Sequence, residues 1–93
     1  MVVKTAEIRL YAPWVHSLKE KRMEVKSLLA KVKNRFNVSA IEAGEQDTHQ
    51  TIVLGLACAA NTLLLAESEL QAAVAFIEQN TEAQVTDVLF ETR

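Results

Sequence analysis

The sequence has few of the residues that mark specialised folds: one cysteine, one proline and two glycines among 93 residues. A single cysteine excludes an internal disulfide and is typical of a reducing compartment. The longest stretch without charge, residues 51–66, is shorter than the roughly 20 apolar residues of a membrane span, and Asn61 and Thr62 interrupt it. The first ten residues lack the continuous apolar core of a signal peptide. We therefore expect a cytoplasmic protein that does not cross a membrane.

The chain does have an ordinary globular composition, with charge distributed unevenly along it. Hydrophobic residues make up 49% and charged residues 24%, close to the average of globular proteins. At 93 residues the chain has room for one core, which predicts a single domain, 1–93. Residues 1–36 carry nine Lys or Arg and three acids, whereas residues 37–93 carry one Arg and nine acids. This asymmetry indicates either a surface that faces a polyanion or two halves that attract each other, within the fold or between subunits.

Hydrophobic periodicity predicts four strands and two helices. Residues 3–12 alternate apolar and polar side chains, as a half-buried strand does. Ser17 stands three residues before Glu20, the spacing of a capping box, and predicts a helix over 18–36. The remaining predicted elements are strands at 38–44, 50–59 and 84–92, a polar turn at 45–49 and a second helix at 63–79. The apolar residues expected to face inward from the second helix are Leu63, Leu70, Val74 and Ile77.

The order β-α-β-β-α-β predicts an α+β, ferredoxin-like fold: a four-stranded antiparallel sheet with two helices on one face. In this arrangement the first and third strands are central. The third strand is apolar on both faces, and no helix would cover its second face. We therefore expect a homo-oligomer that associates through the open sheet face; the alternative is that small residues are tolerated on a wet face.

A projection at 100° per residue divides the basic side chains of the first helix into two groups. The first group contains no acid and is called the basic stripe; its members are Lys19, Arg22, Lys26 and Lys33. The second group alternates with Glu20 and Glu24, which predicts a solvated mixed-charge face; its members are Lys21, Lys31 and Arg35. The basic stripe is consistent with RNA binding, with an acidic protein partner, or with long stems that only cover apolar surface.

The scarcity of aromatic residues, 5% of the chain, bears on the RNA hypothesis. Sheet-face RNA-binding modules stack bases on two or three aromatic side chains. Here the first predicted strand has only Tyr11, and the third has none. If RNA is bound, we expect contacts from the helix flank to the RNA backbone rather than base stacking.

No motif indicates catalysis, a cofactor or a metal site. The two histidines and Cys58 lack metal-ligand spacing, and Cys58 lies within an apolar strand as core cysteines do. The turn "GEQDTH" brings Glu45, Asp47 and His49 together and is the best acid–base candidate, although polar turns of this kind are common. We therefore predict a protein that is not an enzyme, with no catalytic residue, no cofactor and no metal, and with Asp47 and His49 as a secondary surface.

Several short segments follow one another in a specific order: "SLKEKR" at 17–22, "RFNVS" at 35–39, Gln46–Asp47 in a polar turn, and Leu54–Gly55. In this pattern the whole chain resembles the YlxP-like family of small bacterial proteins of undetermined function. The resemblance implies a ferredoxin-like fold and a bacterial cytoplasmic protein, and it brings no catalytic residues. Genes of this family often lie among those for transcription elongation, translation initiation and ribosome maturation, which implies a role near RNA or the ribosome. Members commonly carry tryptophan two residues after the aspartate, where this chain has His49, so any partner contact made by that aromatic would differ here.

The residues and the resemblance together predict a non-enzymatic factor that binds RNA or a ribosomal subunit through the basic stripe. The alternative is a protein–protein adaptor whose basic stripe docks an acidic partner. A third hypothesis is a small-molecule-binding regulatory domain, since other ferredoxin-like domains have that role. The connection "APWVHS" supplies neither the phosphate-binding loop that an acylphosphatase would need nor the glycine that a regulatory domain usually carries at that turn.

Overall fold

A computed structural model describes residues 1–46 and 48–93, so Asp47 lies outside the described residues. Its elements, in chain order, are β1 (Val2–Tyr11), α1 (Leu18–Arg35), β2 (Ser39–Gly44), β3 (Thr51–Ala60), α2 (Leu63–Asn80) and β4 (Gln84–Thr92). The six predicted elements are therefore confirmed, each within one residue at either end.

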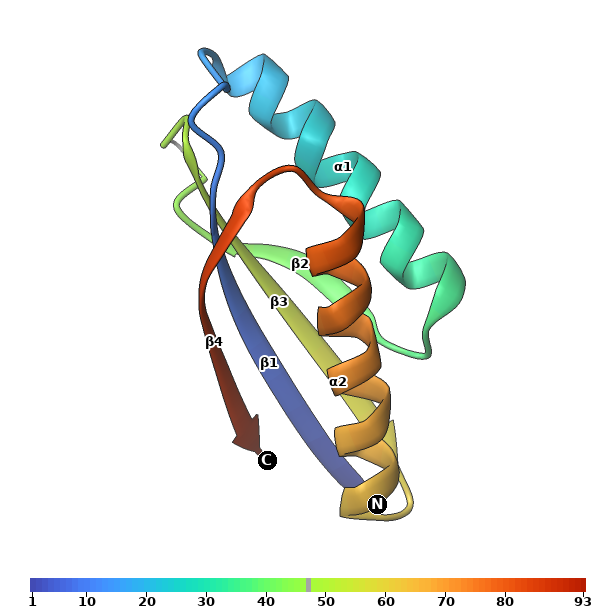
Figure 1. Ribbon diagram of the computed structural model, residues 1–93. Helices are drawn as coiled ribbons and strands as arrows, with labels where there is room; N and C mark the ends of the chain where they lie inside the picture. Colours follow the sequence, from blue (N-terminus) through green and yellow to red (C-terminus); the bar gives the residue numbers. More distant parts are fainter. Residues whose placement is uncertain (47) are drawn as a thin grey trace.

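The four strands form one sheet in the order β2-β3-β1-β4, and every neighbouring pair is antiparallel. β1 and β3 are central, as the ferredoxin-like prediction requires. Both helices pack on one face of the sheet: α1 lies against β2, and α2 lies against β1 and β3 (Figure 1). The predicted fold class is confirmed.

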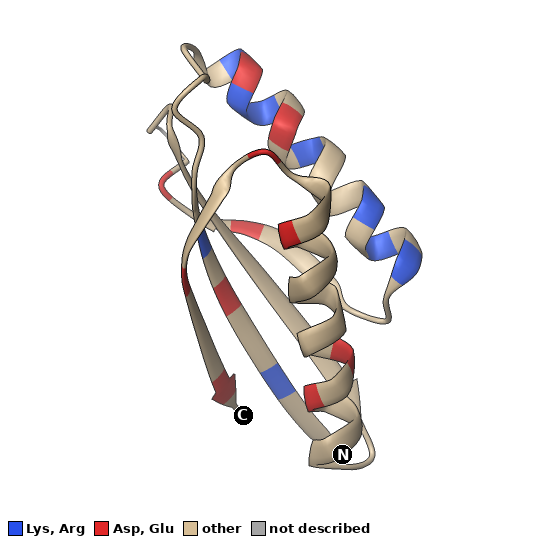
Figure 2. Cartoon of the chain, in the orientation of Figure 1, with Lys and Arg blue, Asp and Glu red and all other residues tan. Residues whose placement is uncertain are grey.

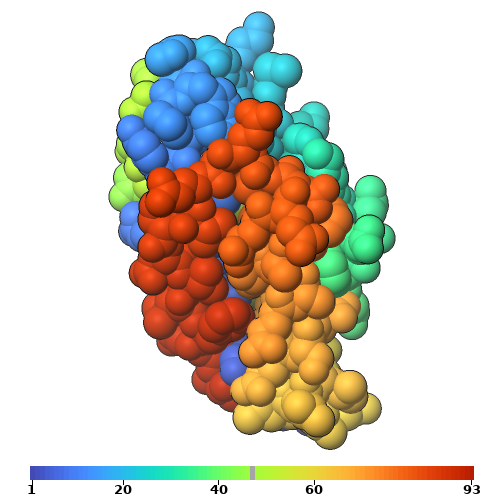
Figure 3. All heavy atoms as spheres, viewed as in Figure 1, coloured from blue at the N-terminus to red at the C-terminus, as the bar shows by residue number. Residues whose placement is uncertain are grey.

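The core lies between the sheet and the two helices, and strand alternation determines which side chains enter it. Most even-numbered residues of the central strands face the helices and are buried: Ala6, Ile8, Leu10, Ile52, Leu54, Leu56 and Cys58. The helices contribute Val25, Leu28, Val32, Leu70, Ala73, Val74 and Ile77. In Figure 3, α2 and β4 lie side by side on the visible face, with atoms of β1 between them. Lys4 of β1 joins these two elements: its ammonium pairs with Glu67 at 2.7 Å and lies 5.8 Å from the Phe90 ring centroid.

The second helix corrects one sequence prediction. Leu63, expected in the core, is 43% exposed, and the next two leucines are 72% and 58% exposed. The buried face of α2 begins one turn later, at Ala66. The first turn of α2 lies at the end of the sheet, beside the start of β1 (Figure 1), and so its side chains extend past the layer that buries the rest of the helix.

Both helices begin with a hydroxyl cap. The Ser17 hydroxyl accepts a hydrogen bond from the Glu20 backbone N–H at 3.1 Å and donates one to the Glu20 carboxylate at 3.4 Å. The Thr62 hydroxyl accepts from the Leu65 N–H at 3.2 Å. Each hydroxyl satisfies a backbone donor that the helix itself cannot pair. The predicted start of α1 at the S-x-x-E motif is confirmed.

Replacing Ser17 by alanine should therefore lower the free energy of unfolding by about 1 kcal/mol. Chemical denaturation followed by circular dichroism would measure the change. Ser27, exposed in the middle of α1, offers a matched control. Ser27→Ala should be neutral or slightly stabilising because alanine is the better helix former. Equal effects of the two variants would contradict the capping role.

Candidate nucleic-acid interface

A groove of about 460 Å³ runs between α1 and β2. Its apolar lining residues are Val25, which is buried, Leu29, which is half-buried, and Ala30, which is exposed. Arg22, Lys26 and Lys33, three members of the basic stripe, also line the groove, together with Asn34 and Glu42. Residues 22, 26, 29 and 33 are spaced by four, three and four positions, so they share one face of the helix. Tertiary structure thus places the basic stripe along the wall of a groove.

Lys19, the fourth member of the basic stripe, is exposed in the first turn of α1 and is not among the groove-lining residues. It lies three residues before Arg22 and seven before Lys26, on the same flank of the helix. The structure therefore brings three of the four predicted residues together and leaves Lys19 one turn beyond them.

The basic residues that line the groove form no ion pair with an acidic side chain within the described residues. The ion pairs there are Lys4–Glu67, Lys21–Glu42 and Arg93–Glu91, and none involves the basic stripe. Arg22, Lys26 and Lys33 are all exposed. Like charges on one helix flank repel each other, and a polyanion or an acidic surface would relieve that repulsion.

The two helices differ strongly in charge (Figure 2). α1 carries seven Lys and Arg residues and two Glu, whereas α2 carries three Glu and no basic residue. On the flank facing α2, the Arg35 guanidinium lies 5.1 Å from the Phe76 ring centroid. Part of the charge asymmetry of the sequence is thus a contrast between two helices that pack against each other, and the net positive charge extends along α1.

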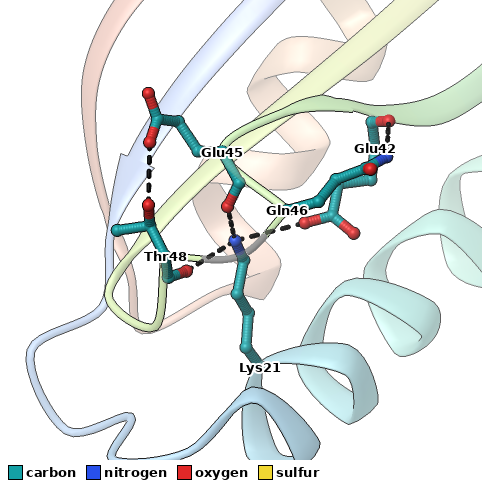
Figure 4. A network of polar contacts seen from close by, with 5 residues as sticks. All are labelled: Lys21, Glu42, Glu45, Gln46 and Thr48. Atoms are coloured by element: carbon teal, nitrogen blue, oxygen red, sulfur yellow. Dashed lines mark hydrogen bonds and ion pairs between the residues drawn. The ribbon is translucent and has the colours of Figure 1, made fainter.

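Lys21 corrects the prediction of a mixed-charge face. Its side chain is 1% exposed, and its ammonium donates hydrogen bonds to the backbone carbonyls of Glu45 and Thr48, the latter at 2.7 Å (Figure 4). The same ammonium forms an ion pair with a Glu42 carboxylate oxygen at 3.3 Å. A buried ammonium needs such partners because leaving water is costly for a charge. Lys21 therefore fixes the connection between β2 and β3 to the first turns of α1.

A sequence signal for Lys21 does exist. It stands four residues before Val25, seven before Leu28 and eleven before Val32, which is the spacing of the buried face. A helical projection at 100° per residue places Lys21 between Leu28 and Val32, in the middle of the buried face. The sequence prediction assigned it to the mixed-charge face because lysine is charged. A projection cannot show that carbonyls of a turn remote in sequence will meet the ammonium.

Glu42 is part of both the groove and the polar network around Lys21. Its side chain lines the groove and pairs with Lys21, and the paired oxygen accepts no hydrogen bond from the described residues. The contact is thus electrostatic, without hydrogen-bond geometry. Sequence reasoning missed Glu42, because its place beside α1 depends on the pairing of β2 with β3. Through this carboxylate, the buried lysine orients one wall of the groove.

The polar turn was the best acid–base candidate in the sequence. Asp47 lies outside the described residues, so its part in the predicted secondary surface stays a prediction. Glu45 has a positive φ of 55°, and its carboxylate accepts a hydrogen bond from the Thr48 hydroxyl at 2.9 Å. His49 is exposed. Within residues 1–46 and 48–93, no group of three His, Cys, Asp or Glu side chains is arranged to hold a metal ion.

Cys58 is the chain's one thiol, and it is buried in β3. Burial, with a smaller contribution from the Glu69 carboxylate, raises the pKa of the Cys58 thiol above its ordinary value. A protonated thiol is a poor nucleophile. The structure thus supports the prediction that Cys58 is a core residue.

Neither described helix is both long enough and apolar enough to span a bilayer.

Fold and groove together define a small ferredoxin-like domain with a basic helix flank. Comparison with known proteins places this domain in a family. Residues 3–90 match the model of the protein family of unknown function DUF503. The chain is also 44% identical, over 70 residues, to the uncharacterized protein YlxP of Bacillus subtilis (strain 168), a match that covers 75% of this chain and 76% of the relative. The chain belongs to the DUF503 family, and the resemblance deduced from "SLKEKR" and "RFNVS" is confirmed.

Proposed function

We propose that this protein is a non-enzymatic, ribosome-associated factor that binds the sugar–phosphate backbone of RNA along the groove between α1 and β2. The observation that carries the proposal is the convergence of Arg22, Lys26 and Lys33 on one groove, without an acidic partner in the described chain. Lys19 extends the same flank by one turn. The gene neighbourhood implied by the family resemblance supports RNA as the polyanion.

The dimensions of the basic stripe suit a backbone rather than a single phosphate. Residues 22 to 33 span about 16 Å along a helix that rises 1.5 Å per residue. A ligand that contacts all three basic residues of the groove must therefore carry several negative charges along its length. Arg and Lys side chains that neutralise successive phosphates release counterions, which drives association.

The composition of the groove also favours backbone recognition. None of its lining residues is aromatic, so the groove offers no platform for base stacking. The single acidic lining residue, Glu42, is paired with Lys21. We therefore expect RNA binding with little sequence preference, as for proteins that contact phosphate and sugar.

Cosedimentation with ribosomal subunits over a salt series tests this proposal. Three phosphate contacts predict that log K falls with log salt at a slope of about −2, so affinity should drop roughly 20-fold from 50 to 200 mM salt. Purified ribosomal RNA should bind with a similar slope. The absence of binding at low salt, or binding that salt leaves unchanged, would contradict the proposal.

One observation favours a second candidate, a protein–protein adaptor. Val25, Leu29 and Ala30 line the groove beside its basic residues, and this combination also suits an acidic amphipathic segment. Pull-down from a lysate, with and without nuclease, separates the two candidates. RNA-mediated capture should disappear after nuclease treatment, whereas an adaptor should keep its partner.

A further inference from the structure

The sheet face opposite the helices presents a hollow of about 220 Å³. Strand register places Ile41, Gly55, Glu7 and Leu89 in one row across all four strands. The next row contains Ser39, Ala57, Thr5 and Glu91. The central strand β3 contributes only Gly55 and Ala57 to these rows, and both line the hollow. The Ile41 side chain already packs beside Gly55, with its Cγ1 3.4 Å from the position that a Cβ on Gly55 would take.

Large apolar side chains flank this hollow on the two edge strands. Ile41 on β2 is 59% exposed, and Leu89 on β4 is 52% exposed. Both line the hollow together with the small residues of β3. Projecting side chains and a recess thus occur on the same face. In an interface with two-fold symmetry each patch must fit a second copy of itself, and a face that carries both projections and a recess can do so.

The open sheet face carries both acidic and basic side chains. Glu7 and Arg9 lie on β1, Asp87 is in register with Arg9, and Arg93 pairs with Glu91 at 3.6 Å. A face that carries three carboxylates disfavours a nucleic-acid ligand. A second copy turned about a two-fold axis can bring acids of one chain to bases of the other.

We propose that the open face binds a second copy of this chain, with the exposed Ile41 and Leu89 side chains of each copy packed against the hollowed face of its partner. The dimer is then a helix–sheet–sheet–helix sandwich in which both α1 grooves face outward. Each dimer would present two polyanion sites on opposite sides. The dimer does not depend on RNA binding, and its test uses no RNA.

Light scattering coupled to gel filtration, with sedimentation equilibrium for the dissociation constant, tests the dimer. The wild-type chain should have twice the 10.3 kDa mass of one copy. Leu89→Glu and, separately, Ile41→Glu should each weaken the dimer by about 30-fold or more, because a charge replaces an apolar contact of the interface. Both side chains are exposed in one copy, so the monomers should keep the wild-type circular dichroism spectrum.

Leu64→Glu is the matched control, since Leu64 is 72% exposed but lies on α2, away from the open face. It should leave the dimer intact. A wild type that is still monomeric at about 100 µM protein would overturn the proposal. So would a dimer that both open-face variants preserve, or one that Leu64→Glu alone dissociates.

Discussion

Replacing Lys21 by methionine should lower the free energy of unfolding by about 3 kcal/mol, more than any substitution of an exposed lysine on the same helix. Methionine matches the stem of lysine but removes the ammonium. The carbonyls of Glu45 and Thr48 then lose their donor, and the Glu42 carboxylate loses its ion-pair partner. Urea denaturation at a fixed protein concentration, followed by circular dichroism, would measure the loss.

Two further variants separate the network from the helix. Lys31→Met changes an exposed lysine of α1 and should stay within about 0.5 kcal/mol of the wild type. Glu42→Gln added to Lys21→Met should recover part of the lost stability, because it removes the uncompensated carboxylate. If Lys21→Met and Lys31→Met behave alike, the buried network does not stabilise the fold.

Reversing two charges of the groove, Arg22→Glu with Lys26→Glu, should reduce affinity for ribosomal RNA on the order of 100-fold at low salt. Both side chains are exposed and line the groove, so their loss removes two phosphate contacts and introduces repulsion. The slope of log K against log salt should also become shallower by about 1.4, two-thirds of its wild-type value, because two of three phosphate contacts are lost. Filter binding over a salt series would measure both quantities.

Lys31→Glu with Arg35→Glu is the matched control. These residues have the same four-residue spacing on the same helix and give the same change in net charge, but neither lines the groove. Arg35 instead lies against the Phe76 ring. The control should lose far less affinity than the groove variant. Equal losses would mean that net charge, rather than the groove, attracts RNA.

The sequence determined the elements and the fold class of this protein. Strand alternation in β1, the hydroxyl cap at Ser17 and the doubly apolar β3 are local patterns, and local patterns specify helices, strands and their buried faces. The order of the elements then leaves few topologies, because the crossover connections have a preferred hand. The basic stripe was likewise visible, since its members share one flank of a single helix.

Only the tertiary structure decided how these charges are used. Lys21 and Lys26 carry the same side chain on the same helix, yet one is buried in a polar network and the other lines a groove. The difference depends on β2 and on the following turn, which supply Glu42 and two backbone carbonyls from at least 20 residues further along the chain. The exposed first turn of α2 has a similar cause, because the end of the sheet limits which leucines find a layer to pack against. The position of a lysine or a leucine in the helical pattern can be read from the sequence. The free energy of burying its side chain depends on groups that only the folded chain brings beside it.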